Sequence, residues 1–298
     1  MTYRTRFAPS PTGPLHLGHA YSALLAHDLA KEAGGQFLLR IEDIDQSRAR
    51  PHWEEQIFDD LAWLGLDWPR PVMRQSDRLP NYRAGLTTLQ DLGVLYPCVC
   101  SRRDIQEAAS APQEGAQAFG PDGLIYPGTC RHSPPAKEDI ENAALRLDIE
   151  KALNLVGGSV SFVETGSGDE VVHHLDTATA VRDIGDVVLA RREMGTSYHL
   201  SVVMDDAAQK INCVVRGADL FDATGIHVLL QKLLSLPTPL YHHHRLIRDD
   251  AGKRLAKRDD ARAIVKYRAD GCSPEDIRAM VGLADQTMGP ITSTSTPS

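Results

Sequence analysis

The sequence has 298 residues and a formal net charge of −8, with 42% hydrophobic and 24% charged residues. These values are ordinary for a globular protein of two or three domains, and they exclude a chain that is disordered throughout. The negative charge argues against a protein that coats nucleic acid indiscriminately, although a local basic patch can still contact a phosphate backbone.

The hydrophobic pattern and the cysteines bear on where the protein works. The sequence holds no run of 18 apolar residues and no secretory pattern at its start, so we expect a cytoplasmic protein without a membrane segment. Three of the five cysteines fall within 33 residues. This clustering favours a metal site in a reducing compartment over a framework of disulfides.

The first predicted elements are a strand over residues 2–7, a tight loop, and a helix over residues 20–33. The six residues from Pro9 to Pro14 include three prolines and a glycine. A loop that opens into a helix presents unpaired backbone N–H groups and the positive end of the helix dipole, which together can hold a phosphate. His16 and His19 lie at this entrance with Gly18 between them. A solvated turn with two incidental histidines fits the same spacing.

A strand over residues 36–41 follows a glycine stop, so the order strand, helix, strand predicts the βαβ unit of a parallel sheet. Ligands of such sheets lie beyond the carboxyl ends of the strands, where Glu42 falls. Its carboxylate could hold an ammonium group, and a solvated acidic turn is the alternative. Helices are predicted over residues 53–64 and 79–92.

A cysteine cluster comes next, with Cys98 and Cys100 followed by Cys130. Two thiolates separated by one residue can bind one ion, and further ligands across a loop would complete a tetrahedral set. On general chemistry His132 is the more usual fourth ligand. Four protein ligands would make the site structural rather than catalytic. Three buried free thiols without a metal are the alternative.

The loop over residues 109–122 is predicted to be mobile, and strands are predicted over residues 144–149, 158–164 and 186–190, the last of which should resume the parallel sheet. A helix over residues 196–208 carries Tyr198, and a strand over residues 211–216 ends at Arg216. An arginine fork matches a carboxylate at two points. Arg6 and Arg216 are therefore candidates for binding substrate carboxylates, with Tyr198 as a hydrogen-bonding wall, whereas a surface ion pair is the alternative for either arginine alone.

The C-terminal part combines a predicted helix over residues 223–236 with a basic segment. Residues 242–244 are three histidines, but successive residues on a strand face opposite ways, so we do not expect them to share a metal ion. Residues 245–268 contain nine Lys or Arg against four Asp, which suits phosphate contact or a solvated helix face. Helices are predicted over residues 260–269 and 273–281, the second with a capping serine, and the tail from residue 285 is predicted to be disordered.

Two short segments resemble known signatures. His16-Leu17-Gly18-His19 resembles the HIGH tetrapeptide of class I aminoacyl-tRNA synthetases, and residues 6–13 resemble the start of their glutamyl and glutaminyl branch. The segment Arg254-Leu255-Ala256-Lys257-Arg258 resembles the second signature, KMSKS, with Arg254 in place of the first lysine and Ala256 in place of the serine. The missing hydroxyl puts only a secondary contact in doubt.

The resemblance can be narrowed to one branch. A tyrosine four residues before the last cysteine, together with the Cys-x-Cys pair, resembles the zinc set of the glutamyl-queuosine tRNA(Asp) synthetases. The second signature is followed by only two predicted helices, where glutamyl-tRNA synthetases continue into a domain that reads the anticodon. The resemblance therefore favours Tyr126 over His132 as the fourth zinc ligand.

The resemblance implies a Rossmann-like α/β fold with a parallel sheet, a zinc-bearing inserted subdomain and a short helical C-terminal segment. The expected divisions are residues 1–95 for the first half of the catalytic domain, 96–182 for the insertion, 183–240 for the second half, 241–284 for the signature loop and helical segment, and 285–298 for the tail.

The resemblance also implies roles for individual residues. Those expected to be catalytic are His16, His19 and Lys257. Those expected to bind glutamate are Arg6, Ala8, Ser10, Glu42, Tyr198 and Arg216. Those expected to bind ATP, which enters with Mg²⁺, are Pro9, His16, Gly18, His19 and Lys257. Those expected to bind a structural Zn²⁺ are Cys98, Cys100, Tyr126 and Cys130.

The implied activity is activation of glutamate by ATP without tRNA, followed by transfer of glutamate to the queuosine base of tRNA(Asp). We expect a monomer. Two other functions fit parts of the sequence: a non-catalytic tRNA-binding paralogue, in which the altered second signature marks lost chemistry, and a nucleotidyltransferase of the same superfamily that acts on a small phosphorylated metabolite.

Overall fold

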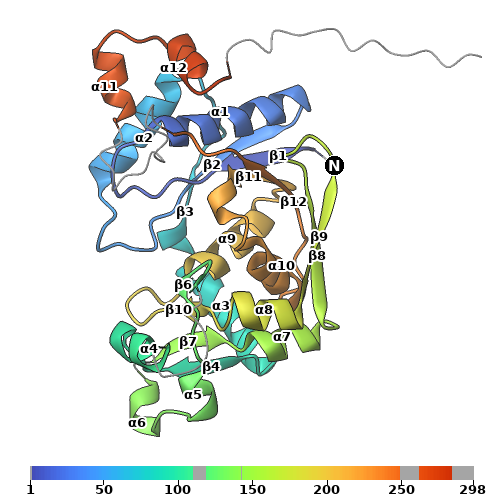
Figure 1. Cartoon of the computed structure of the whole chain (residues 1–298). Helices are drawn as coiled ribbons and strands as arrows, with labels where there is room; N and C mark the ends of the chain where they lie inside the picture. The colour runs from blue at the N-terminus through green and yellow to red at the C-terminus, as the bar shows by residue number, and fades with distance from the viewer. Residues whose placement is uncertain (1, 110–118, 142, 249–261, 284–298) are drawn as a thin grey trace, which may run out of the picture.

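The computed structural model describes residues 2–109, 119–141, 143–248 and 262–283 (Figure 1). Three predicted features lie outside these residues: the second signature with Arg254, Ala256 and Lys257, most of the loop predicted to be mobile, and the tail from residue 285.

The N-terminal half forms the predicted βαβ unit. Strands β1 (Arg4–Phe7), β2 (Gln36–Ile41) and β3 (Met73–Arg74) pair in parallel in that order. The connecting helix α1 (Leu17–Glu32) begins three residues earlier than the sequence indicates, because His16 caps it. The predicted helices that follow are confirmed as α2 (Pro51–Trp63) and α3 (Leu79–Asp91), with the 3₁₀ turn η1 (Gln75–Arg78) before α3.

The second half of the chain places two more parallel strands beside β1. Strand β11 (Cys213–Gly217) pairs with β12 (Leu240–His244), and the backbone N–H of Asn212 donates to the carbonyl oxygen of Arg4 at 3.2 Å. Helix α9 (Tyr198–Ala208) precedes β11, and the turn η2 (Ala218–Leu220) and helix α10 (Thr224–Leu233) join β11 to β12.

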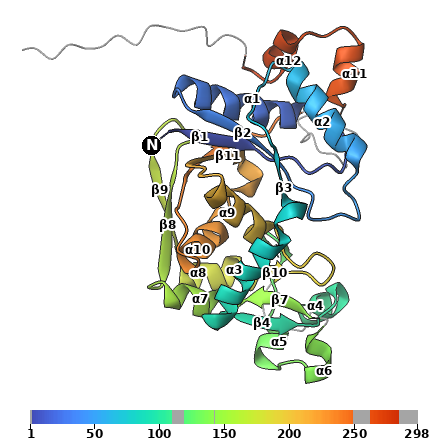
Figure 2. The ribbon, with the colours of Figure 1, turned by 180° about the vertical axis from the view of Figure 1, so that it is seen from behind.

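Helices cover both faces of the layer that these two neighbouring sheets form. In Figures 1 and 2, α1 and α2 lie on one side of β1, β2 and β11, and α9 and α10 lie on the other. The side chains of β11 alternate accordingly, since Cys213 and Val215 belong to the hydrophobic cluster around α1 while Val214 belongs to the cluster around α10. The layered α/β architecture with a parallel sheet is thus confirmed.

A hairpin extends the sheet at its far edge. Strands β8 (Ser159–Glu164) and β9 (Val171–Asp176) are antiparallel, and β8 pairs in parallel with β12, Glu164 lying opposite Tyr241. Residues 96–182, which we expected to form a separate insertion, are therefore divided between sheets. Strands β8 and β9 of this segment continue the sheet of β11 and β12. The division into domains stays a proposal.

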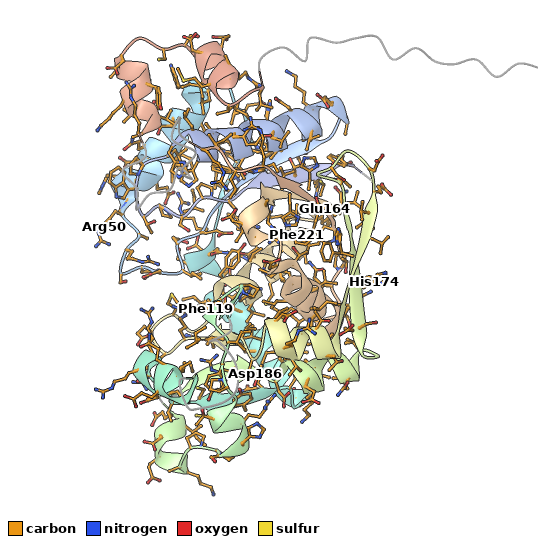
Figure 3. All side chains as sticks on the ribbon, viewed as in Figure 1. Arg50, Phe119, Glu164, His174, Asp186 and Phe221 are labelled. Atoms are coloured by element: carbon orange, nitrogen blue, oxygen red, sulfur yellow. The ribbon has the colours of Figure 1, made fainter. Side chains whose placement is uncertain are left out.

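A separate antiparallel sheet lies at the other end of the molecule (Figure 2). Its order is β10 (Val188–Ala190), β7 (Ala144–Leu147) and β4 (Leu95–Cys98). The expectation that residues 186–190 resume the parallel sheet is wrong. The buried Asp186, labelled in Figure 3, fixes them here because its carboxylate accepts hydrogen bonds from Tyr96 Oη at 2.6 Å and from Ile149 N at 3.0 Å.

Short elements surround this second sheet. They are α4 (Arg102–Ala109), β5 (Phe119–Gly120), β6 (Gly123–Leu124), α5 (Thr129–His132), α6 (Lys137–Ile140), α7 (Ile149–Leu155) and α8 (Thr177–Asp183).

The last described helices, α11 (Ile264–Ala269) and α12 (Pro274–Met280), return to the N-terminal half. The predicted capping serine is confirmed, since Ser273 and Asp276 form a reciprocal capping box. Arg278 on α12 forms an ion pair with Asp28 on α1 at 2.7 Å. No helix among the described residues is both long and apolar enough to span a membrane.

Candidate functional site

A cavity of about 500 Å³ opens where the carboxyl ends of β1 and β11 meet the start of α1. Eight of the residues singled out from the sequence line it together: Arg6, Ala8, His16, Gly18, His19, Glu42, Tyr198 and Arg216. Pro9 and Ser10 line an adjoining cavity, which shares the side chains of His19, Glu42 and Tyr198 with the first. The structure thus brings together segments that lie up to 210 residues apart in the chain.

The two histidines of the entrance fix each other through α1. His16 Nδ1 accepts a hydrogen bond from Gly18 N at 3.1 Å, and His19 Nδ1 accepts one from His16 N at 3.2 Å. Because each ring uses Nδ1 as an acceptor, the neutral form of each carries its proton on Nε2. A Cβ on Gly18 would lie 3.0 Å from the His16 ring, so glycine is needed for this close approach. Both rings are therefore oriented with an Nε2–H donor.

Arg6 is anchored by an aspartate that the sequence did not point to. Its Nε and Nη2 donate to Asp206 Oδ1 and Oδ2 at 3.0 and 3.2 Å, and Nη1 donates to the carbonyl oxygen of Val215 at 3.2 Å. Asp206 also accepts a hydrogen bond from Arg40 Nη1 at 2.6 Å. Burial disfavours the charged carboxylate, but Arg6 and Arg40 outweigh it and hold the pKa of Asp206 below its ordinary value.

Glu42 belongs to the same network. One of its oxygens accepts a hydrogen bond from Arg40 Nη2 at 3.0 Å, and its backbone N–H donates to the carbonyl oxygen of Pro9 at 3.0 Å. Burial raises the pKa of Glu42 above its ordinary value, and the neighbouring Arg40 only partly opposes this. A carboxylate in this state gains from binding a cation.

Arg216 is held in a different way from Arg6. Its Nε donates to His243 Nε2 at 3.0 Å, its Nη1 to His227 Nδ1 at 2.9 Å and its Nη2 to Thr224 Oγ1 at 2.8 Å. The guanidinium carbon lies 5.2 Å from the centre of the Tyr241 ring. Three of its five N–H donors are thus used by described residues, and the side chain faces the cavity.

Tyr198 forms another wall of the cavity at the first position of α9. Its ring meets the His227 ring edge-on, with centroids 5.5 Å apart. Burial raises the pKa of Tyr198, so its hydroxyl stays protonated and can donate a hydrogen bond.

The cysteine cluster lies at the other sheet, where Cys98 ends β4 and Cys130 lies on α5. The Sγ atoms of Cys98, Cys100 and Cys130 all lie within 4.8 Å of one another. The hydroxyl of Tyr126 lies 3.4 Å from both Cys98 Sγ and Cys100 Sγ. His132 is exposed on α5, and its Nε2 lies 3.5 Å from Arg131 Nη2.

The chain leaves the described residues beside the cavity and re-enters them there. Leu246 and Ile247 line the cavity after β12, and Ile264 N donates to the carbonyl oxygen of Leu15 at 2.9 Å. Lys257 itself lies between these points, outside the described residues.

Sequence reasoning missed the residues that support the arginines, namely Arg40, Glu164, Asp206, Thr224, His227 and His243. A weak signal exists for some of them. Arg40 interrupts an apolar strand, and Asp205 and Asp206 interrupt an apolar helix, so each indicates a buried charge in need of a partner. The identity of that partner is a long-range property of the fold.

The sequence is similar to known proteins over most of its length. Residues 2–293 match the family described as tRNA synthetases class I (E and Q), catalytic domain. The chain is 63% identical over 281 residues to Glutamyl-Q tRNA(Asp) synthetase of Rhodobacter capsulatus, covering 94% of this chain and 99% of that protein. It is 42% identical over 302 residues to the protein of the same name from Symbiobacterium thermophilum, covering 94% of this chain and 87% of that protein.

Solved structures of longer proteins share the fold. Glutamate-tRNA synthetase from Elizabethkingia anophelis superposes with a TM-score of 0.76 at 24% identity, covering 95% of this chain and 61% of that one. A glutamate tRNA ligase from Elizabethkingia meningosepticum, in complex with its amino acid, gives 0.73 at 25% identity with the same coverage of 95% and 61%. The chain therefore spans less than two thirds of the length of these two proteins.

Proposed function

The chain belongs to the glutamyl-Q tRNA(Asp) synthetases, within the class I family of glutamyl and glutaminyl synthetases, and we propose that it activates glutamate with ATP and transfers it to the queuosine base of tRNA(Asp). The observation that carries this proposal is that a single cavity is lined by Glu42, Arg6 and Arg216 together with the two histidines of the entrance. These side chains complement an ammonium group, carboxylates and a phosphate, the three groups that an amino acid and ATP bring together.

Glutamate binds through charge and hydrogen bonds at one end of the cavity. Glu42 receives the α-ammonium group, Arg6 and Arg216 receive the carboxylates, and the Tyr198 hydroxyl hydrogen-bonds beside them. Ala8 and Ser10 line the path from β1. Aspartate, one methylene shorter, cannot span the same groups and should not be activated.

ATP binds at the start of α1. The backbone N–H groups there and the Nε2–H donors of His16 and His19 face the phosphates, Gly18 and Pro9 let the nucleotide approach closely, and Lys257 contributes a positive charge. Mg²⁺ enters with the phosphates and neutralises part of their charge.

The chemistry needs no nucleophile from the protein. An oxygen of the α-carboxylate of glutamate attacks the α-phosphorus of ATP, pyrophosphate leaves, and a mixed anhydride of glutamate and AMP forms. A nucleophile of the queuosine base then attacks the anhydride carbonyl carbon, and AMP leaves. The protein contributes alignment, and positive charge where negative charge gathers in the transition state.

We also propose that Cys98, Cys100, Tyr126 and Cys130 bind a structural Zn²⁺. The three sulfur atoms lie within 4.8 Å of one another, and the phenol oxygen lies 3.4 Å from two of them. This arrangement favours a four-coordinate metal site over three thiols without a metal. The exposed His132 is the weaker candidate. Metal analysis of the purified protein should give one zinc per chain, reduced by Tyr126→Phe and unaffected by His132→Gln.

Pyrophosphate exchange tests the first step. With ATP and labelled pyrophosphate, exchange should require glutamate and should not require tRNA. No exchange would support the non-catalytic paralogue, and exchange without glutamate would support the nucleotidyltransferase.

Transfer to tRNA tests the second step. Labelled glutamate should appear on tRNA(Asp) that carries queuosine and not on the same tRNA without it. Equal labelling of both would refute the proposed acceptor. A cytoplasmic location and a monomeric state stay predictions.

A further inference from the structure

The two arginines of the cavity differ in how their charge is balanced. Arg6 contacts the Asp206 carboxylate with two N–H groups, so its charge is largely neutralised at short range. Within the described part of the chain, the hydrogen bonds of Arg216 go to two imidazoles and one hydroxyl. Among the described residues, the hydrogen bonds that connect Arg216 to carboxylates pass through histidines.

The first of these connections runs through His243 to Glu164. Arginine has no acceptor, so His243 Nε2 must accept the bond from Arg216 Nε, and the proton of the neutral ring must lie on Nδ1. Nδ1 faces Glu164 Oε2 in a short contact. The other oxygen of Glu164 accepts from the backbone N–H groups of His243 and Gly166 at 2.8 and 2.7 Å. The ring of Phe221, which is labelled with Glu164 in Figure 3, packs edge-on against His243, with the ring centroids 5.1 Å apart.

The second connection runs through two histidines to Asp122. His227 Nδ1 accepts from Arg216, so its Nε2–H points to His199 Nδ1 at 3.1 Å. The Nε2–H of His199 then donates to Asp122 Oδ1 at 2.9 Å. In this series of hydrogen bonds, each donor determines the tautomer of the next imidazole ring.

Burial keeps the two rings that touch Arg216 uncharged. Burial, with the charge of Arg216 adding to it, lowers the pKa of His243 to about 4 and that of His227 well below its ordinary value. The hydrogen bond to Glu164 opposes the shift of His243 without cancelling it. Near neutral pH, Arg216 is therefore surrounded by neutral donors and acceptors that orient its planar fork.

We propose that Glu164 and Asp122 are positioning residues, which act through fixed histidine tautomers to hold Arg216 oriented and unneutralised for a substrate carboxylate. Arg216 is then the principal carboxylate anchor, and Arg6, already paired with Asp206, is the secondary one. The identification of the carboxylate as that of glutamate rests on the proposed function, whereas the tautomers do not.

The substitution Glu164→Gln tests the positioning role of Glu164, because glutamine has almost the same size and shape as glutamate. The amide oxygen stays where two backbone N–H groups hold Oε1, so the amide NH₂ faces His243 Nδ1. The ring must then accept at Nδ1 and carry its proton on Nε2, where it meets the N–H of Arg216. Two donors cannot share a hydrogen bond, and Arg216 must turn away.

We expect Glu164→Gln to raise the KM for glutamate about tenfold or more in pyrophosphate exchange, with the KM for ATP unchanged and kcat reduced much less. Asp122→Ala, further from Arg216, should raise the KM for glutamate two- to threefold. The matched control is Glu150→Gln on α7, whose side chain is exposed and should leave all constants unchanged. An unchanged KM in folded Glu164→Gln would overturn the proposal, and an unchanged KM in Asp122→Ala would remove its second connection.

Nitrogen NMR of the histidine rings gives a readout that does not depend on activity. In the unaltered protein, His243 should be neutral with its proton on Nδ1, and Glu164→Gln should move the proton to Nε2. A His243 ring protonated on Nε2 in the unaltered protein would refute the proposal even if the variant failed to fold. Absence of glutamate-dependent exchange in a protein with the expected tautomers would refute the proposed function instead.

Discussion

At the scale of single residues, His16 combines two tasks that use different atoms of one ring. Nδ1 caps α1 through Gly18 N, and the neutral ring carries its proton on Nε2 in a side chain that lines the cavity. Capping stabilises the helix, whereas the donor is the part assigned to phosphate. The two tasks can therefore be separated by a substitution that keeps only one of them.

His16→Asn should make this separation, because asparagine is a good N-cap whose oxygen can replace Nδ1 but which offers nothing at the place of Nε2. We expect the free energy of unfolding to stay within about 0.5 kcal/mol, and adenylate formation to slow by roughly 10² with the KM for glutamate unchanged. His16→Ala, which loses both atoms, should also lose about 1 kcal/mol of stability. A normal exchange rate in His16→Asn would remove the assigned role.

The raised pKa of Glu42 predicts how the binding of glutamate depends on pH. Burial raises its pKa above the ordinary value of 4.5, so the carboxylate is protonated at a higher pH than usual and then no longer attracts an ammonium group. The KM for glutamate should therefore rise as the pH falls toward this raised pKa, while the KM for ATP follows a different profile. Glu42→Gln should raise the KM at neutral pH and flatten this acidic limb. If the KM for glutamate still rose at acidic pH in Glu42→Gln, the titrating group would be a residue other than Glu42.

At the scale of elements, α2 contains an aspartate in an unfavourable place. Asp60 is fully buried, and its two carboxylate oxygens have no aligned hydrogen-bond partner among the described residues. Burial, and to a lesser degree the neighbouring Asp59, raises its pKa from 3.8 to about 6. The folded state therefore binds this proton more tightly than the unfolded state does, so stability falls as the pH rises from about 4 to 6 and stays reduced above that.

Asp60→Asn should remove this penalty, which amounts to about 3 kcal/mol at most for a shift of about two pKa units. We expect the variant to be more stable than the unaltered protein at pH 7.5 by about 1–3 kcal/mol and to lose the pH dependence between pH 5 and 7.5. Urea unfolding at both pH values measures this. The exposed Glu55→Gln on the same helix is the control and should change stability much less. Equal pH dependence in Asp60→Asn and the unaltered protein would contradict the assignment.

Elements with local signals were predicted well. Helix α1 and strand β2 follow from an apolar pattern ended by glycines, and α12 from its capping serine. Strand β9 was not predicted, because its sequence alternates weakly and it is a strand only through pairing with β8. Strand β10 was predicted as a strand but in the wrong sheet. The local sequence pattern carries no information about β7, the strand with which β10 pairs.

At the scale of the whole molecule, Asp206 joins the two halves of the chain, because Arg6 and Arg40 belong to the first strands and α9 belongs to the second half. Asp206→Asn would leave two buried guanidinium groups short of a carboxylate, and we expect a loss of about 3–5 kcal/mol in the free energy of unfolding. Chemical denaturation measures this.

The matched control is Asp28→Asn, which also breaks a long-range ion pair, between α1 and α12. That pair is partly exposed, so the loss should be below about 1 kcal/mol. Equal losses in the two variants would show that burial is not what makes Asp206 important.

The candidate site was predictable only as far as short motifs reach. The entrance histidines, Glu42 and Arg216 could be named because each follows a strand or opens a helix in a recognisable segment. Asp206 could not be named as the partner of Arg6, since the two lie 200 residues apart and nothing local connects them. The histidines behind Arg216 were missed for the same reason.

The buried Arg40 has a consequence for how the protein is made. It lies in β2, with no exposed surface, while its partner Asp206 is 166 residues further along the chain. On the ribosome, β2 and Glu42 emerge long before Asp206, which receives Arg40 Nη1, so the buried guanidinium lacks this carboxylate and the first strands cannot reach their final packing until α9 has been synthesised. Nascent chains interrupted before that point should remain open to proteases and be held by chaperones.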